Sequence, residues 1–108
     1  MSNANQTPEI FIAAEAVSYS SQSVVSKTLY KNNSGNITLF AFDKGEGLAE
    51  HTTPHQALVQ VLDGTAEITI GGNTFTLQTG GCIFLPANVP HALVAVESFK
   101  MMLAMIKN

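Results

Sequence analysis

The sequence predicts an all-β domain of short antiparallel strands with little or no helix. From Val24 onward, β-branched and aromatic residues recur in short segments that turn signals separate at close spacing. No segment shows the period of an amphipathic helix. Several short strands in one domain are typical of a sandwich, a jelly roll or a small barrel. At 108 residues the chain is long enough for one such domain with its own core.

Eight segments carry the strand pattern, and glycine-containing turns separate several of them. Strands are expected over residues 24–31, 36–43, 57–63, 65–71, 73–78, 82–86, 91–97 and 99–107. The turns are expected at Asn33-Ser34-Gly35, Asp63-Gly64, Gly71-Gly72-Asn73 and Gly80-Gly81. Pro86 and Pro90 bracket a loop, because proline cannot donate a hydrogen bond to a central strand.

Residues 1–23 are expected to form an N-terminal arm and connector, ahead of a β-barrel domain over residues 24–108. The first eight residues are polar, and we expect them to be mobile or to reach over a neighbouring copy. Residues 9–17 fit either a single helical turn or a short strand, and the pattern does not decide between them. Residues 18–23 form a serine-rich connector.

Period-two alternation indicates which side chains face the interior, because successive residues of a strand point to opposite faces. The inward set is expected to comprise Ala57, Val59, Val61, Ala66, Ile68 and Ile70. His51 and His55 are in phase with the first three of these residues. The histidines are therefore expected to share a face with an apolar interior.

Charged side chains are scarce in this chain. It has five basic and eight acidic residues, 12% of the total, which is about half of the usual share. In the segment 36–43, Phe40 and Phe42 alternate with Leu39 and Ala41, so both faces of this strand need a cover. We therefore expect a second surface to be buried against another copy of the chain, in a homodimer.

The composition also excludes several partners. The net charge is −3 and there is no basic run, so neither nucleic acid nor an anionic membrane is an expected partner. The single Cys82 has no partner for an internal disulfide, and in an apolar strand we expect a buried, inert thiol. The N-terminal residues lack the features of a signal peptide, and no apolar run approaches the length of a membrane span. The expected location is the cytoplasm.

The three histidines of the chain lie in two glycine-bounded segments. His51 and His55 lie in GEGLAEHTTPHQALVQVLDG, residues 45–64, and His91 ends GGCIFLPANVPH, residues 80–91. Neutral imidazole is the commonest metal ligand, and three converging imidazoles suit a divalent transition metal. The competing interpretation is a solvent-facing loop position, and it is strongest for His55 because this residue follows a proline.

These two segments resemble the two motifs of the cupin superfamily, in particular those of its minimal single-domain bacterial members. The matching anchors are Gly45, His51 and Gly64 in the first motif and Gly80, Pro86 and His91 in the second. The resemblance covers roughly residues 24–107. It implies a double-stranded β-helix, that is a jelly-roll barrel, which holds a metal and a small molecule and usually dimerises.

The chain departs from the cupin pattern at four positions. Thr53 stands where the second motif histidine is expected, and Ala57 stands where the motif glutamate is expected. Asn88 replaces a glycine, a mild change because asparagine tolerates left-handed backbone geometry. Ala95 replaces an asparagine.

The resemblance implies that His51 and His91 are retained metal ligands. His55 is a relocated third candidate, because two residues along a strand restore the same face. Gln56 or Gln60 would complete the shell, and Gln56 is favoured because Gln60 is out of phase with the inward valines. Zinc, iron, manganese and nickel all accept imidazoles, so the identity of the metal stays open. Without the glutamate we expect weaker metal retention, and an empty pocket is the alternative.

The leading functional prediction is a metal-binding cupin that holds an apolar, aromatic or short acyl molecule against the inward-facing residues Val59, Val61, Ala66 and Ile68. As an enzyme it would activate dioxygen or polarise a carbonyl or enolate substrate. No carboxylate is in phase with the inward set, which counts against the epimerase and isomerase types of cupin. The alternative is a non-enzymatic binding or sensing module with a degenerate metal site. A structural dimer with a vestigial pocket is the third possibility.

Overall fold

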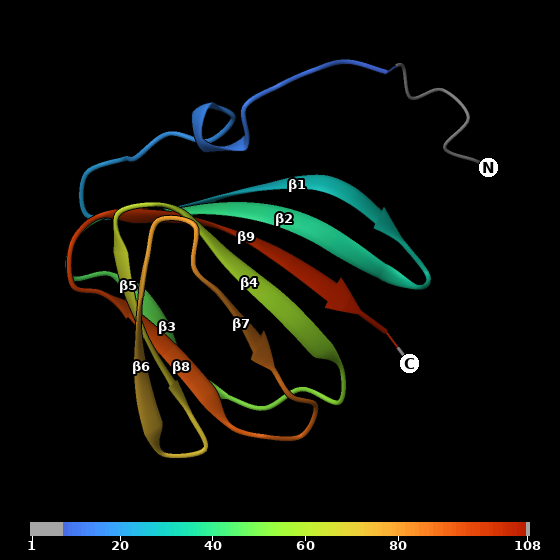
Figure 1. Cartoon of the computed structure of the whole chain (residues 1–108), viewed down its shortest axis with the longest axis vertical. Coiled ribbons are helices and arrows are strands. Elements are labelled where there is room, and N and C mark those ends of the chain that lie inside the picture. Colours follow the sequence, from blue (N-terminus) through green and yellow to red (C-terminus); the bar gives the residue numbers. More distant parts are fainter. Residues whose placement is uncertain (1–7, 108) are drawn as a thin grey trace.

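The computed structural model describes residues 8–107, which form one short 3-10 turn and nine strands (Figure 1). The turn η1 covers Ala13–Glu15, so the segment that fitted either a turn or a strand contains a turn. The strands are β1 Val24–Asn32, β2 Gly35–Phe42, β3 Gly47–His51, β4 Gln56–Asp63, β5 Thr65–Ile70, β6 Asn73–Gln78, β7 Cys82–Leu85, β8 His91–Ala95 and β9 Phe99–Ile106. All eight expected strands are present. The ninth, β3, lies where the sequence suggested a glycine-rich loop.

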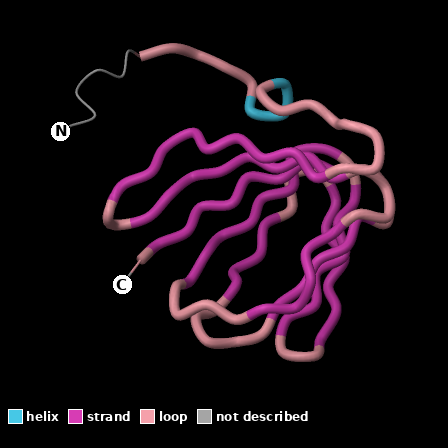
Figure 2. Tube along the Cα trace, turned by 180° about the vertical axis from the view of Figure 1, so that it is seen from behind, coloured by secondary structure: helices cyan, strands magenta, loops and turns pink. Residues whose placement is uncertain are grey.

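The strands form two antiparallel sheets that face each other as a jelly roll (Figure 1, Figure 2). The five-stranded sheet, here sheet A, has the order β1-β2-β9-β4-β7, and the four-stranded sheet B has the order β3-β8-β5-β6. Every strand pair is antiparallel. The predicted all-β jelly-roll class is therefore confirmed.

The core lies between the two sheets and follows the expected alternation. The odd-numbered apolar residues of β4 and the even-numbered apolar residues of β5 face inward, as predicted. Val59, Val61, Ala66 and Ile68 are all completely buried. Phe42 and Phe99 close one end of the core, with stacked rings whose centroids lie 4.6 Å apart. Because these residues are fully buried in one contiguous cluster, they form a core rather than the wall of an open cavity.

The chain itself covers part of the second apolar face of β2. Leu39 and Ala41 are fully buried on the outer side of sheet A, where Val17 and the η1 segment pack on them. Lys100 donates a hydrogen bond from Nζ to the Ala14 carbonyl, which fixes this segment to β9. The inference that a partner chain must cover this face is therefore wrong for Leu39 and Ala41, because residues of the same chain do so.

The prediction of a buried thiol at Cys82 is wrong, because this residue is exposed. It begins β7, the strand at one edge of sheet A, and its side chain alternates with the inward-facing Ile83 and Leu85. The sequence showed the apolar neighbours of this cysteine but not that β7 lies at a sheet edge. Among residues 8–107, no helix has the length and hydropathy needed to cross a membrane.

Candidate functional site

The candidate site is a pair of histidines on neighbouring strands of sheet B. His51 ends β3 and His91 begins β8, and the two residues are directly opposite each other in the antiparallel register. On the other side of β8, His91 is opposite Ile70 of β5. The pair therefore lies at one end of the sheet, in the last row of side chains that face the barrel interior.

A β-bulge turns His51 toward this interior. Leu48 is opposite Leu93, whereas His51 is opposite His91, so β3 has one more residue than β8 between these two pairs. In a regular strand, Leu48 and His51 would point to opposite faces. The extra residue restores His51 to the inward face, which is a common role of bulges near functional sites.

Glycine lets β3 approach β8 closely. A Cβ atom on Gly47 would overlap the carbonyl oxygen of Leu93 and would lie 3.0 Å from the Cα atom of Val94. Only a residue without a side chain can occupy this position without moving one strand. Sequence reasoning missed this role of Gly47, although the Gly-Glu-Gly run at residues 45–47 was a signal for a special backbone.

The two imidazole rings meet through their Nε2 atoms, which lie 3.1 Å apart. The Nδ1 atom of His51 is 2.9 Å from the carbonyl oxygen of Ala49, and Nδ1 of His91 is 3.2 Å from that of Val89. A carbonyl oxygen can only accept a hydrogen bond, so these two contacts favour the tautomer with the proton on Nδ1. In neutral rings both Nε2 atoms then present lone pairs to each other.

Two facing lone pairs at this distance repel unless a proton or a metal ion lies between them, and a ring that carries a proton on Nε2 would donate it to the other ring. Nitrogen ligands of a tetrahedral zinc ion, each about 2.0–2.1 Å from the metal, are about 3.3 Å apart. The observed Nε2 separation of 3.1 Å is close to that value. Backbone carbonyls that hold the other ring nitrogen are also the usual arrangement around metal-bound histidine. The donor chemistry of His51 and His91 therefore fits a divalent transition metal.

His55 lies apart from this pair. It follows β3 in a turn where its backbone N–H donates to the Thr53 hydroxyl at 3.0 Å. Its Nδ1 atom is buried and has no hydrogen-bond partner in the described part of the chain. Within residues 8–107, no three His, Cys, Asp or Glu side chains come together in a group that could hold a metal ion. The structure thus brings two of the three predicted histidines together.

Gln56 and Gln60 do not point toward the histidines. The burial pattern of β4 alternates, with Ala57, Val59 and Val61 inward, so both glutamines lie on the outer face. Gln56 is exposed. Alternation along the strand excluded Gln60 as a fourth ligand, and it excludes Gln56 equally because the two positions are four residues apart.

The loop between the two prolines holds His91 in place. Asn88 adopts a left-handed backbone with φ of 64°, as expected for a residue that replaces glycine. Its N–H donates to the Thr53 carbonyl at 2.8 Å, and the Pro90 carbonyl accepts from the Gly71 N–H at 2.9 Å. Thr53, which replaces the motif histidine, therefore joins the His55 turn to the loop before His91.

The two histidines differ in exposure, and this difference shows where the site opens. His91 is 5% exposed, whereas His51 belongs to the exposed class. Two apolar side chains beside the pair pack on the core and stay partly accessible: Leu48, on the same strand as His51, and Ile70, opposite His91. A molecule that reached the Nε2 atoms from solvent would approach along the His51 side.

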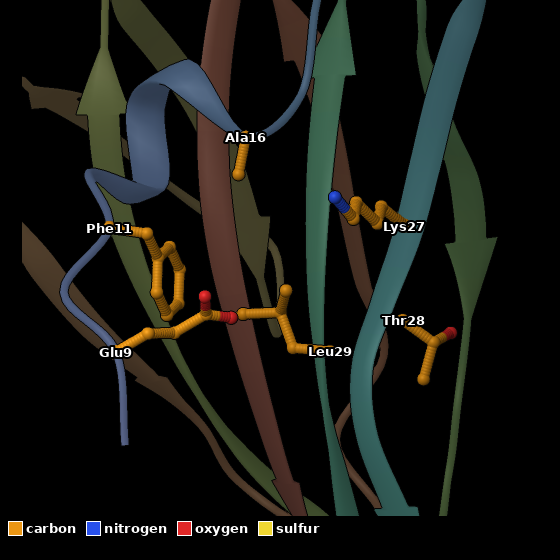
Figure 3. Close-up of a pocket in the computed structure, with 6 residues that line it drawn as sticks. All are labelled: Glu9, Phe11, Ala16, Lys27, Thr28 and Leu29. Atoms are coloured by element: carbon orange, nitrogen blue, oxygen red, sulfur yellow. The ribbon is translucent and has the colours of Figure 1, made fainter. Parts of the chain in front are cut away.

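A groove of about 310 Å³ lies elsewhere, between the N-terminal arm and β1 (Figure 3). Glu9, Phe11 and Ala16 line it from the arm, and Lys27, Thr28 and Leu29 line it from β1. Neither a histidine nor a residue of sheet B contributes to it. The groove is therefore distinct from the histidine site.

Comparison with known proteins agrees with the fold. The family model described as the cupin domain matches residues 38–107, which include both histidine strands. The chain belongs to the cupin family. Among curated proteins, none matches this cupin.

Three solved structures illustrate the likeness of this cupin to known folds. A conserved protein of unknown function from Streptococcus pyogenes is 36% identical, with a TM-score of 0.91 over 100% of this chain and 96% of the other. A cupin 2 conserved barrel domain protein from Leptotrichia buccalis is 41% identical, with a TM-score of 0.84 over 87% of this chain and 46% of the other. A salicylate 1,2-dioxygenase from Pseudoaminobacter salicylatoxidans is 18% identical, with a TM-score of 0.72 over 80% of this chain and 27% of the other. At that identity the dioxygenase shares the fold alone.

Proposed function

We propose that this cupin binds one divalent transition metal ion through His51 and His91 and a small apolar, aromatic or acyl molecule beside it. The observation that carries the proposal is the meeting of the two Nε2 atoms 3.1 Å apart, while each Nδ1 atom lies within hydrogen-bond distance of a backbone carbonyl. Such pre-positioned nitrogens gain interaction energy when a cation binds and need no rearrangement. Zinc, iron, manganese and nickel all accept imidazole ligands.

The residues around the pair favour an apolar ligand. Leu48, on the strand of His51, and Ile70, opposite His91, are partly buried and pack on the core. The ligand would contact these residues rather than Val59, Val61, Ala66 and Ile68, which the core encloses completely. When bound, the metal would act as a Lewis acid toward a carbonyl or enolate group or would activate dioxygen. The protein's own part would be to bind the molecule at the His51 side and to exclude water with these apolar side chains.

A non-enzymatic binding or sensing module is the second candidate, and one observation favours it. The described residues bring two imidazoles together rather than a full set of three or four ligands. A site with fewer protein ligands holds its metal more weakly, which suits reversible occupancy better than a permanent catalytic centre.

Metal titration tests the proposal. We expect the purified protein to bind about one zinc or nickel ion per chain in calorimetry, and His51→Ala or His91→Ala to weaken binding at least about tenfold. His55→Ala is the matched control, and it should leave the affinity within about threefold if the site has two ligands. An equal loss in all three variants would instead support a three-histidine site. Wild-type protein that binds no divalent ion at millimolar concentration would contradict the proposal.

We also propose that the cupin forms a homodimer. The low content of charged side chains supports this, together with large apolar residues that stay exposed on one face of sheet A, such as Phe84 and Ile106. Sedimentation velocity should show a dimer at micromolar concentration, and a monomer there would contradict this proposal.

A further inference from the structure

Two charges of opposite sign line the groove between the N-terminal arm and β1 (Figure 3). Lys27 belongs to β1 and Glu9 to the arm, and both residues are exposed. Among residues 8–107 the salt bridge joins Lys44 to Glu97, and neither Lys27 nor Glu9 takes part in one. The groove therefore presents one cation and one anion that are free to pair with a ligand.

Lys27 stands at the edge of an apolar floor. Val25 and Leu29 lie on the same face of β1, and both pack on the apolar cluster that contains Leu39 and Ala41. Leu39 is directly opposite Lys27 in the register and is fully buried. The Lys27 side chain points from β1 toward the arm (Figure 3). Its ammonium group is thus directed across the groove.

The arm forms the opposite wall. The hydrogen bond from Lys100 to the Ala14 carbonyl fixes the η1 segment on sheet A. Ahead of this anchor the chain runs alongside β1 and leaves the groove of about 310 Å³ between them. Phe11 lines this wall and is 55% exposed, and the Glu9 side chain points from the arm toward Leu29 (Figure 3).

The charges and the apolar lining together restrict the class of ligand. The volume of the groove is at the lower end of the range for small-molecule sites. A molecule with only a carboxylate would be attracted by Lys27 and repelled by Glu9, and a molecule with only an ammonium group would meet the reverse. A zwitterion pairs favourably with both residues. An apolar body between its charges would contact Phe11 and Leu29.

We propose that this groove binds a zwitterionic amino acid or dipeptide with an apolar side chain. The carboxylate faces Lys27, the ammonium group faces Glu9, and the apolar side chain lies against Phe11 and Leu29. No residue of sheet B lines the groove, so this site is independent of the function proposed for the histidine pair. Ion pairs of exposed residues contribute little, so we expect a dissociation constant of roughly 1 mM.

Matched ligands test the two charges separately in NMR titrations of the whole chain. L-leucine should bind, and it should shift the amide signals of Lys27 and Leu29 but not that of His51. Leucinamide lacks the carboxylate and 4-methylpentanoate lacks the amine, so each should bind about two- to fivefold more weakly than leucine. Glycine should bind at least about tenfold more weakly, because it has no apolar side chain. Leucyl-leucine distinguishes a dipeptide site from an amino-acid site by which of the two binds more tightly.

Charge variants assign each end of the ligand to one residue. Lys27→Gln should abolish the preference for leucine over leucinamide, and Glu9→Gln should abolish the preference over 4-methylpentanoate. Lys31→Gln on the same strand and Glu15→Gln in η1 are the matched controls, because neither residue lines the groove. Both controls should keep both preferences.

A further pair of variants tests the apolar wall. Phe11→Ala should weaken leucine binding about three- to tenfold. Ile12→Ala is the control, since Ile12 is 60% exposed and does not line the groove, and it should leave the affinity unchanged. Thermal unfolding checks that every variant is folded.

Three results would overturn the proposal. They are no binding of leucine or leucyl-leucine at about 10 mM, equal affinity for leucine and both of its analogues, and equal losses in the control variants. Metal titration of Lys27→Gln and leucine titration of His51→Ala should both match the wild type. Failure of this proposal is therefore distinguishable from failure of the metal site.

Discussion

At the scale of single residues, hydrogen bonds to backbone carbonyls decide what the histidine pair can bind. The Ala49 and Val89 carbonyls each lie within hydrogen-bond distance of an Nδ1 atom, and in the tautomer that donates to them the two Nε2 atoms are acceptors that face each other. A carboxylate at Ala57 or an imidazole at Thr53 would have added ligands, but the chain has neither. Two nitrogens in a fixed geometry are therefore the whole donor set that the structure brings together within residues 8–107.

Asp43 shows how one side chain joins three distant segments. Its carboxylate accepts from the Gln22 N–H at 2.7 Å and from the Ser98 hydroxyl at 3.1 Å. These hydrogen bonds, first that of Gln22, then that of Ser98 and that of the Lys44 N–H, lower the pKa of Asp43 below its ordinary value of 3.8. Asp43 therefore links the connector before β1 to the turn before β9.

The lowered pKa of Asp43 predicts an acid-sensitive contribution to stability. Its stabilisation is present above the unfolded pKa and is lost as the pH falls through the folded pKa. We expect Asp43→Asn to lower the free energy of unfolding at neutral pH and to flatten its decline between about pH 5 and pH 3. Urea unfolding at several pH values measures this. Ser98→Ala should have the same effect to a smaller extent, and an unchanged acid profile in Asp43→Asn would contradict the prediction.

At the scale of elements, the path of β3 along β8 brings His51 to His91. The bulge between Leu48 and His51 turns His51 inward, and Gly47 allows β3 to lie against β8. Both features concern the same strand pair, which carries both histidines. The Nε2 separation therefore depends on how closely these two strands approach each other.

Gly47→Ala should disturb this approach. The new Cβ atom would overlap the Leu93 carbonyl, so β3 must shift away from β8. We expect the free energy of unfolding to fall by about 1–3 kcal/mol, and metal affinity to fall with it. Gly45→Ala is the control: its φ is +88° with nothing within 4 Å of the added atom. That variant should lose stability through backbone strain but keep the metal affinity, whereas equal metal losses in both would argue against the close-approach explanation.

At the scale of the whole molecule, the N-terminal segment is part of the packed structure. Val17 is 4% exposed beneath η1, and the Tyr19 hydroxyl donates to Asp63 at the end of β4. Burial and the Asp63 carboxylate both raise the pKa of Tyr19, so this hydrogen bond persists until strongly alkaline pH. The apolar cluster of Ala13, Ala16 and Val17 with Leu39 and Ala41 therefore joins the N-terminal segment to sheet A.

Val17→Ala tests whether this cluster stabilises the whole molecule. Removing two buried methyl groups should lower the free energy of unfolding by about 2 kcal/mol, in a single cooperative transition. Denaturant unfolding, followed by circular dichroism, measures the change. Val96→Ala is the matched control, since Val96 is 44% exposed, and it should change stability by less than about 0.5 kcal/mol. A Val17→Ala variant as stable as the wild type would show that the segment packs without contributing to the fold.

The sequence by itself determined eight of the nine strands, the inward-facing sets of β4 and β5, and the family. Alternation and turn residues act over a few neighbours, so Val59, Ala66 and Ile68 could be placed in the core without tertiary information. The spacing of His51 and His91 from their motif glycines likewise located the two histidines that the fold brings together. These features are encoded locally and therefore can be recognised along the chain.

Only the tertiary structure decided the remaining features. The bulge that aims His51, the outward face of Gln56 and the exposure of Cys82 depend on which strand lies beside which, and at what register. The same holds for the cover of Leu39 and Ala41 by residues 13–17. The physical reason is that each of these features arises from contacts between segments far apart in the sequence, whose pairing the local pattern does not specify.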